Sequence, residues 1–206
     1  MSKENYVQYN LNDLIRELGE NRVESILSDF SCPKNVDVEY FARKKAIEFS
    51  KRGFAKTHLV YYCNEETKEN RLVGYYAIAN KNILVSKRAL NQKARSRIHN
   101  HGEYISELKK YLVTAPLIGQ LGKNYKDNND KLILGSELLG MAIDKIKKAQ
   151  YDIGGKFIYL ECEDIEKLTK FYEKNGFVEF GKRKLDADET NIKGKELIQF
   201  LLYSKG

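Results

Sequence analysis

Residues 111–183 decide the fold: YLVTAPLIGQLGKNYKDNNDKLILGSELLGMAIDKIKKAQYDIGGKFIYLECEDIEKLTKFYEKNGFVEFGKR. Their pattern predicts a strand, a polar loop, a long helix, a strand, a second helix and a third strand. The first strand is expected from residue 111 to about residue 123, with Pro116 and Gly119 breaking its regularity. A strand–helix–strand connection of this length implies a right-handed crossover, and therefore a parallel or mixed sheet.

The spacing of apolar residues predicts the two helices of this stretch. After the polar loop at 124–130 they recur at helical spacing: Leu134, Leu138, Ala142 and Ile146, with Leu139 and Ile143 alongside. The short apolar run at 157–160 has the length and composition of a strand. The second helix carries Leu168, Phe171 and Tyr172 on one stripe. It is expected to stop at Asn175-Gly176, because this pair suits an exit through the left-handed region.

Gly135 lies near the start of the long helix. Glycine in a helix costs roughly 1 kcal/mol relative to alanine, so its presence indicates that something approaches the backbone closely. A helix N-terminus with free N–H groups, a nearby lysine (Lys131) and a hydroxyl (Ser136) suits a phosphate group. The alternative is a helix start that happens to contain glycine. The second signal is the segment that contains Phe171 and Tyr172. Its alternative interpretation is a core aromatic stripe.

Together, these two signals resemble the GCN5-related N-acetyltransferase (GNAT) superfamily. The segment Tyr172-Glu-Lys-Asn-Gly-Phe177 matches the Tyr-x-x-x-Gly-Phe segment of that family in full. Gly135 fits the last position of the family's Gln/Arg-x-x-Gly-x-Gly/Ala signature, whereas Asp130 and Ile133 depart from it. The resemblance implies an α/β (α+β) fold: a central mixed, mostly antiparallel sheet with helices on both faces. Strands four and five would splay around Gln120 and Glu161 to hold acetyl-CoA.

The resemblance also implies a site. Backbone N–H groups of the strand would polarise the thioester carbonyl and align the pantetheine, and the loop and helix start would hold the pyrophosphate. The cofactor-binding residues would be Leu121, Gly122, Lys123, Lys131, Leu132, Ile133, Leu134, Gly135 and Ser136. Tyr172 would be the general acid, because a phenol of pKa near 10 is still protonated when a thiolate of pKa about 8.5 departs. No base is assigned. Glu161 and Glu163 are the nearest acidic candidates in sequence, and the alternative is that they pair with lysines in solvent.

The implied activity is an enzyme that moves an acetyl group from acetyl-CoA to a primary amine by direct attack in a ternary complex. The segment Phe30-Ser-Cys32 followed by Asp37-x-x-x-Phe41 resembles an element of a GNAT subgroup that includes toxins acetylating aminoacyl-tRNA. A tRNA-directed acetylating toxin is therefore one alternative. A non-catalytic module that binds acetyl-CoA or nucleic acid is another, and a homodimer stays open.

The composition limits the possible domain organisation, location and metal content of the protein. The chain has 206 residues, of which 42% are hydrophobic, enough for one domain over residues 1–206. No apolar run approaches 18 residues, and the N-terminus lacks the apolar stretch of a signal peptide, so no membrane is expected. Cys32, Cys63 and Cys162 form no CxxC pair. We therefore expect reduced thiols, a cytoplasmic location and no metal.

Charge points to an anionic partner, because the net charge is +7 and the pI about 9.1. Residues 86–107 form an excursion that a compact GNAT lacks. From Lys87 to Arg97 it carries five basic and no acidic side chains, with Leu90, Ala94 and Ile98 on a helical stripe. The excursion either shapes the entrance for an acidic or phosphate-bearing acceptor, or is a solvated helix packed by its apolar stripe. A role for His99 and His101 as metal ligands is the less favoured reading.

The remaining segments are predicted from short patterns. We expect a short first strand within residues 6–15, helices at 22–29 and at about 37–51, the second capped by Asp37. We expect an antiparallel pair at 57–63 and 72–79, with a bulge at Gly74. A strand at 197–203 is expected at a sheet edge or against another subunit.

Overall fold

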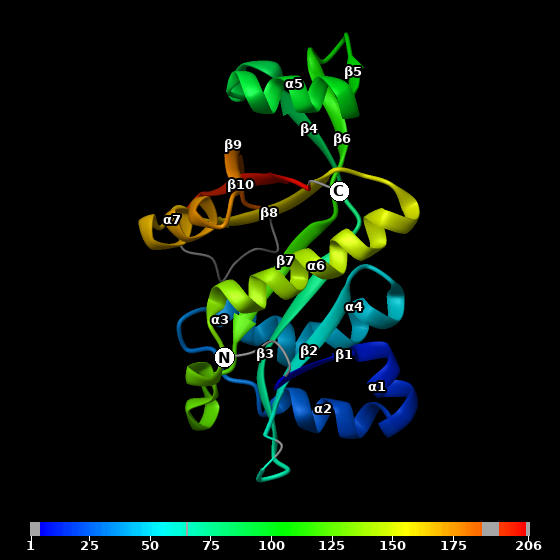
Figure 1. Ribbon diagram of the computed structural model, residues 1–206, viewed down its shortest axis with the longest axis vertical. Coiled ribbons are helices and arrows are strands. Elements are labelled where there is room, and N and C mark those ends of the chain that lie inside the picture. Colours follow the sequence, from blue (N-terminus) through cyan, green and yellow to red (C-terminus); the bar gives the residue numbers. More distant parts are fainter. Residues whose placement is uncertain (1–4, 65, 187–193, 205–206) are drawn as a thin grey trace. The chain divides into compact units, whose positions relative to one another are not determined.

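The computed structural model describes residues 5–64, 66–186 and 194–204 (Figure 1). The chain forms two compact units, and each is described by itself. Unit 1 comprises the residues up to Ala79 together with Gly119–Ala142. Unit 2 comprises Asn80–Ile118 and the residues from Ile143 onward. The expectation of a single domain stays a prediction.

The strands form a larger and a smaller sheet. The larger has the order β1-β2-β3-β7-β8-β10-β9, and the smaller has the order β4-β6-β5. Their bounds are β1 Tyr6–Asn10, β2 Lys56–Cys63, β3 Asn70–Ala79, β4 Asn82–Ser86, β5 Glu103–Ile105, β6 Lys110–Thr114, β7 Leu117–Lys123, β8 Phe157–Glu163, β9 Val178–Lys184 and β10 Glu196–Tyr203. The β7–β8 ladder is parallel, whereas β1–β2, β2–β3, β8–β10 and β9–β10 are antiparallel. The predicted mixed, mostly antiparallel sheet is therefore confirmed.

Unit 1 begins with one strand and a series of helices. The helices are α1 Leu11–Leu18, α2 Glu20–Ser28, α3 Val36–Tyr40, the π-helix η2 Phe41–Lys45 and α4 Ala46–Arg52. The α1 helix was not predicted from the sequence. It starts directly after β1, where the Asn10 side chain accepts the Asn12 N–H. The prediction of Asp37 as N-cap is wrong. Asn35 accepts the Val38 N–H, and Asp37 lies in the first helical turn.

Helices cover both faces of β3 within unit 1. Tyr75 is fully buried among side chains of the first four α-helices, and its hydroxyl donates to the Val38 carbonyl at 2.6 Å. The neighbouring Gly74 faces the opposite side, because adjacent residues of a strand alternate. A Cβ at Gly74 would lie 3.0 Å from Leu138 of α6 (Gly135–Ile153). The register of β2 and β3 shifts beside Gly74, which confirms the predicted bulge.

The excursion of unit 2 is a small folded element. After β4 it contains η3 Lys87–Ala89, α5 Gln92–His101 and β5, and β6 pairs with both β4 and β5 (Figure 1). The prediction of one long strand over residues 111–123 is therefore wrong. Pro116 lacks an N–H for the ladder, and the chain breaks at Ala115-Pro116 into β6 and β7. The apolar stripe of α5 packs into the core of unit 2, as the second reading of the excursion predicted.

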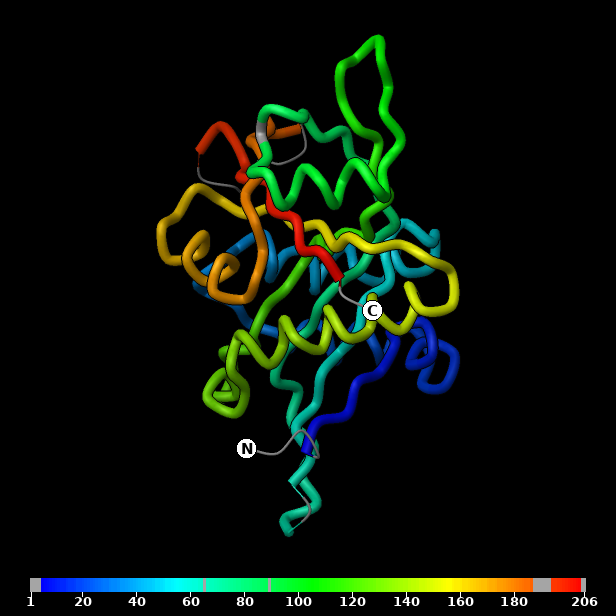
Figure 2. The backbone as a smooth tube through the Cα atoms, turned by 45° about the horizontal axis from the view of Figure 1, so that its top comes forward, coloured from blue at the N-terminus to red at the C-terminus, as the bar shows by residue number. Residues whose placement is uncertain are grey.

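The rest of unit 2 follows the predicted order. Figure 2 traces β8 in yellow, then α7 (Glu166–Lys174) and β9 in orange and β10 in red. Residues Phe157, Ile158, Tyr159 and Leu160 of β8 are all buried, as a strand covered on both faces requires. The prediction of an edge position for the last strand is wrong, because β10 pairs with β8 on one side and with β9 on the other. Among the described residues, no helix is long and apolar enough to span a membrane.

Candidate functional site

The start of helix α6 is the part of unit 1 that suits a phosphate. Glu137 reaches back and accepts the Leu134 N–H at 2.7 Å, while the Leu134 carbonyl accepts from Leu138 at 3.1 Å. The next two amides, those of Gly135 and Ser136, lie in the first helical turn and have no intrahelical acceptor. They remain as donors at the positive end of the helix dipole. One of the predicted amide donors, that of Leu134, is thus used within the helix cap.

The loop before α6 is fixed from two sides. The Lys123 ammonium donates to the carbonyls of Asp130 at 2.6 Å and Ile133 at 3.0 Å. The Tyr6 hydroxyl donates to the Leu132 carbonyl at 2.6 Å. Burial raises the pKa of Tyr6 to about 12, and the Glu137 carboxylate adds to the increase. Tyr6 therefore holds this loop as a neutral donor.

These contacts decide which of the two lysines is available to a ligand. Lys123 is occupied by two carbonyl groups, whereas the Lys131 side chain is exposed beside the helix start. Lys131 is therefore the better candidate for a charge contact with pyrophosphate. Tyr6 could not be identified from sequence patterns, because 126 positions separate it from Leu132.

Strand β7 passes its neighbours at close range around Gly122. A Cβ on this buried glycine would lie 2.3 Å from Cγ1 of Val38, and a Cβ on Gly74 would lie 2.8 Å from the Gly122 carbonyl oxygen. Two residues earlier, the Gln120 amide donates to the Asp37 carboxylate at 3.1 Å. The position of Gly122 thus depends on the absence of a side chain, and Gln120 is tied to the segment that carries Asp37.

Tyr172 lies near the end of α7 in unit 2. The helix ends where predicted, with Gly176 in the left-handed region at φ 88°. The Tyr172 ring packs against Phe171, Phe177 and Phe200, with ring centroids 5.2, 6.0 and 5.9 Å away. Burial raises the pKa of Tyr172 well above its ordinary value, and the Cys162 thiol adds to the increase. The phenol is therefore a neutral proton donor throughout the physiological range.

Cys162 lies on β8 as a buried free thiol. Burial raises the pKa of Cys162 to about 12, and the carboxylates of Asp164, Glu163 and Glu179 act in the same direction. A thiol that stays protonated is a poor nucleophile. This agrees with the sequence-based preference for a structural thiol.

Cys162 should make stability depend on alkaline pH. Its folded-state pKa is about 12, against about 9 for an unfolded thiol, so the folded state holds a proton that the unfolded state loses in between. Its contribution is complete below pH 9 and declines as the pH rises towards 12, by at most about 1.4 kcal/mol per pH unit. Urea unfolding of the wild type and Cys162→Ala between pH 8 and 11 measures this. The variant should show the shallower decline, and equal slopes would contradict the assignment.

Glu161 on β8 belongs to a polar network and does not face solvent. Its carboxylate binds Arg183 of β9 through two contacts of 2.6 Å and also accepts the Tyr159 hydroxyl. Gln199 of β10 donates to the Tyr159 oxygen at 2.7 Å. The expected lysine partnership of Glu161 is therefore wrong: the partner is an arginine, and the side chain of Glu161 is only 13% exposed. An arginine held this way occupies both carboxylate oxygens, which disfavours Glu161 as a base.

The Arg183–Glu161 pair should matter for stability. Arg183→Met keeps much of the apolar stem but leaves the Glu161 carboxylate buried without its cation, which should cost about 1–3 kcal/mol. Glu161→Gln in the same background removes the unpaired charge and should recover part of the loss. Urea unfolding of the three proteins measures the effect. A single variant as stable as wild type, or a double variant less stable than the single one, would contradict this account.

Metal ligation has no support here. Among the residues that the structure describes, no group of three or more His, Cys, Asp or Glu side chains could hold a metal ion. The two histidines of the excursion lie instead near tyrosines. His99 Nδ1 is 3.1 Å from the Tyr111 hydroxyl, and His101 Nε2 is 3.3 Å from the Tyr203 hydroxyl.

The predicted site residues divide between the two units. Residues 121–123 and 131–136 lie in unit 1, where the Lys123 contacts join the end of β7 to the loop before α6. Tyr172 lies in unit 2. The parallel ladder pairs Leu117 with Tyr159 and Ile118 with Leu160. A splay around Gln120 and Glu161 stays a prediction, because these residues belong to different units.

Comparisons with known proteins show the fold. No protein-family model matches the chain, and no curated protein matches it by sequence. Solved structures do match. AtaT in complex with acetyl-methionyl-tRNAfMet aligns at a TM-score of 0.59 and 16% identity, over 94% of this chain and 93% of that one.

Two further structures agree. A tyrosine-to-phenylalanine mutant of KacT aligns at a TM-score of 0.60 and 13% identity, over 95% and 94% of the two chains. AtaTR bound with acetyl-CoA aligns at 0.56 and 12%, over 98% and 94%. The protein therefore has the fold of AtaT and KacT, which is the GNAT fold expected from its sequence.

Proposed function

We propose that this protein is a GNAT-type acyltransferase that moves an acetyl group from acetyl-CoA to a primary amine. The observation that carries the proposal is its likeness, over nearly the whole chain, to AtaTR solved with acetyl-CoA and to AtaT solved with an acetylated methionyl-tRNA. The full Tyr-x-x-x-Gly-Phe match at Tyr172 supports it independently, because that residue is a partly buried phenol whose raised pKa keeps it protonated.

The start of α6 fits the phosphate end of acetyl-CoA. The amides of Gly135 and Ser136 and the exposed ammonium of Lys131 are donors of the kind that bind pyrophosphate. The absence of a side chain at Gly135 lets a ligand approach the backbone. In β7, the amides of Leu121, Gly122 and Lys123 are the proposed donors for the thioester carbonyl and the pantetheine.

The transfer would occur in one ternary complex. The neutral amine attacks the thioester carbonyl carbon, a C–N bond forms, and the C–S bond breaks. Tyr172 gives its phenolic proton to the departing thiolate, and the new ammonium group loses a proton to solvent, from which the phenolate is reprotonated. General acid catalysis of this kind contributes about 10²–10⁴-fold to a rate.

The acceptor that best fits this site is an α-amine, as in aminoacyl-tRNA. A lysine ammonium of pKa near 10.4 needs a base to become neutral, whereas an α-amine of pKa near 8 is already partly neutral at physiological pH. Glu161 is held by Arg183 and is a poor base. A tRNA-directed acetylating toxin is therefore the favoured form of the proposal. We propose a cytoplasmic location with it, because both proposed substrates are cytoplasmic molecules. A homodimer stays open.

Two linked measurements test the proposal. Calorimetric titration with acetyl-CoA should give saturable binding. Release of free thiol should then be followed with a panel of an aminoacyl-tRNA, a peptide with a free N-terminus, a lysine side-chain analogue and a polyamine. Thiol release with the aminoacyl-tRNA supports a tRNA-directed acetylating toxin. Release with another amine supports an acetyltransferase that acts on a different primary amine.

The same experiment identifies a non-catalytic module. Acetyl-CoA that binds but releases no thiol with any amine would indicate a binding protein. Strong tRNA binding without acetyl-CoA binding would indicate a nucleic-acid module. Growth arrest on expression, with acetylated aminoacyl-tRNA in the arrested cells, would support the toxin.

A further inference from the structure

The positive charge of the chain is concentrated in one segment. Residues 80–118 carry eight Lys and Arg side chains against two Glu, a net charge of +6 of the chain's +7. The eight cations are Lys81, Lys87, Arg88, Lys93, Arg95, Arg97, Lys109 and Lys110. The other 167 residues are therefore almost neutral, and the net charge is a local feature of residues 80–118, which contain the excursion.

These cations have no carboxylate partners among the described residues. Elsewhere, cations are commonly paired: Arg43 with Glu39 at 2.9 Å, Lys126 with Asp29 at 2.6 Å, and Arg183 with Glu161. From residue 87 to residue 101 there is no acidic side chain at all. Unpaired like charges repel one another, so this arrangement favours an external anion.

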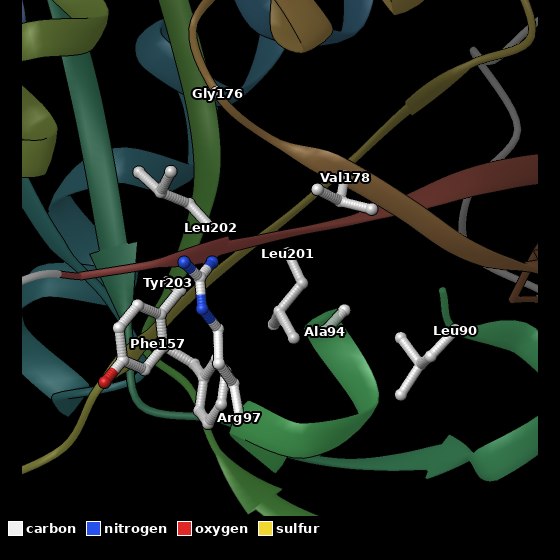
Figure 3. Close-up of a pocket in the computed structure, with 9 residues that line it drawn as sticks. All are labelled: Leu90, Ala94, Arg97, Phe157, Gly176, Val178, Leu201, Leu202 and Tyr203. Atoms are coloured by element: carbon white, nitrogen blue, oxygen red, sulfur yellow. The ribbon is translucent and has the colours of Figure 1, made fainter. Parts of the chain in front are cut away.

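The α5 helix is a firm platform for these side chains. The Asn91 side chain accepts the Ala94 N–H and caps the helix, and Ile98 is fully buried beneath it. The Arg97 guanidinium lies over the Tyr203 ring, 4.4 Å from its centroid, and Figure 3 shows the two side chains together beside Phe157. A stacked guanidinium keeps its in-plane N–H groups for other partners. Arg97 is thus held in place without being neutralised.

The exposed face of α5 has the chemistry of a phosphate contact. Gln92, Lys93, Ser96 and Arg97 line a shallow, open depression, and each of them is a hydrogen-bond donor. Lys93 is exposed, and so are Lys87 and Arg88 of η3 and Arg95 of α5. The large apolar residues between positions 87 and 101, Leu90 and Ile98, point inward and are buried.

We propose that the α5 surface, defined as Lys87, Arg88, Lys93, Arg95 and Arg97, binds the phosphate backbone of a tRNA. This inference rests on the proposed function. It places the RNA part of the aminoacyl-tRNA acceptor on a surface of unit 2. RNA is favoured over an acidic protein because protein partners depend on buried apolar anchors, which this face lacks. Charge and hydrogen-bond donors alone suffice for phosphate binding.

The test is a salt titration of tRNA binding with matched charge variants. The first variant is Lys87→Gln/Arg88→Gln/Lys93→Gln. The control is Lys145→Gln/Lys147→Gln/Lys148→Gln on the C-terminal half of α6, which lowers the net charge by the same amount. Binding of a deacylated, fluorescently labelled tRNA is measured by anisotropy without acetyl-CoA, at several salt concentrations.

The α5 variant should bind about tenfold more weakly or worse, and its plot of log K against log salt should be shallower by about 2, since each lost phosphate contact removes about 0.7–0.9. The control should stay within about threefold of wild type. Lys93→Arg, which preserves the charge, should bind like wild type. Equal losses in both triple variants, or no loss in the α5 variant, would overturn the proposal. Displacement of the tRNA by polyglutamate as efficient as by unlabelled tRNA would also overturn it.

Failure here is distinguishable from failure of the proposed function. Acetyl transfer from acetyl-CoA to a small α-amine that carries no phosphate needs no RNA contact. The α5 variant should therefore retain that reaction. A chain that acetylates the small amine but binds tRNA equally in all variants would refute the α5 assignment alone.

Discussion

Replacing Tyr172 with phenylalanine is expected to lower the rate of acetyl transfer by about 10²–10⁴-fold while leaving acetyl-CoA affinity nearly unchanged. The substitution removes only the phenolic oxygen, and the ring keeps its contacts with Phe177 and Phe200. The thiolate must then leave without its proton donor. Thiol release and calorimetric titration, performed on the same preparation, measure the two effects separately.

The matched control is Tyr151→Phe. Tyr151 lies near the end of α6 and is 91% exposed, so removing its hydroxyl should change neither quantity. A Tyr172→Phe enzyme as fast as wild type would remove Tyr172 from the mechanism. Loss of acetyl-CoA binding in parallel with the rate would show instead that the phenol belongs to the binding site.

Gly122→Ala is expected to destabilise the protein by about 1–3 kcal/mol, the usual cost of an overpacked core. The added methyl group would lie 2.3 Å from Cγ1 of Val38 and 3.4 Å from the Phe30 ring. A valine methyl close to the backbone has little freedom to move aside, so α3 or β7 must shift. Thermal and urea unfolding measure the loss, and acetyl-CoA affinity should also fall if β7 supplies the proposed amides.

Gly140→Ala is the matched control. Gly140 lies in the interior of α6, and a Cβ there meets no atom within 4 Å. Alanine should therefore stabilise the helix by about 0.5–1 kcal/mol. If Gly122→Ala were as stable as wild type, the close passage of β7 beside α3 would be wrong.

The sequence predicted the later part of the fold better than the earlier part. The α6 and α7 helices have long apolar stripes, and Gly176 marks the end of α7 by its positive φ, so local patterns are sufficient there. The α1 helix was missed because it follows β1 without a break. The split between β6 and β7 was missed because both halves are apolar, and Pro116 was read as an irregularity within one strand.

The candidate site was predictable only where a motif is local. Tyr172 and Gly135 were identified from short segments, whereas Tyr6 and Arg183 depend on partners 126 and 22 positions away. No spacing rule connects such residues before the chain is folded. The charge of the excursion was visible in the sequence, but the absence of carboxylate partners among the described residues became visible only in the structure.

Whether this protein is an acetyltransferase is measured by mass spectrometry of an aminoacyl-tRNA incubated with it and acetyl-CoA, with free thiol measured in the same sample. We expect one acetyl group on the α-amine of the amino acid and one thiol released per acetyl group transferred. The proposed activity would be contradicted if acetyl-CoA bound to the protein but remained intact in the presence of this acceptor and the other amines of the panel.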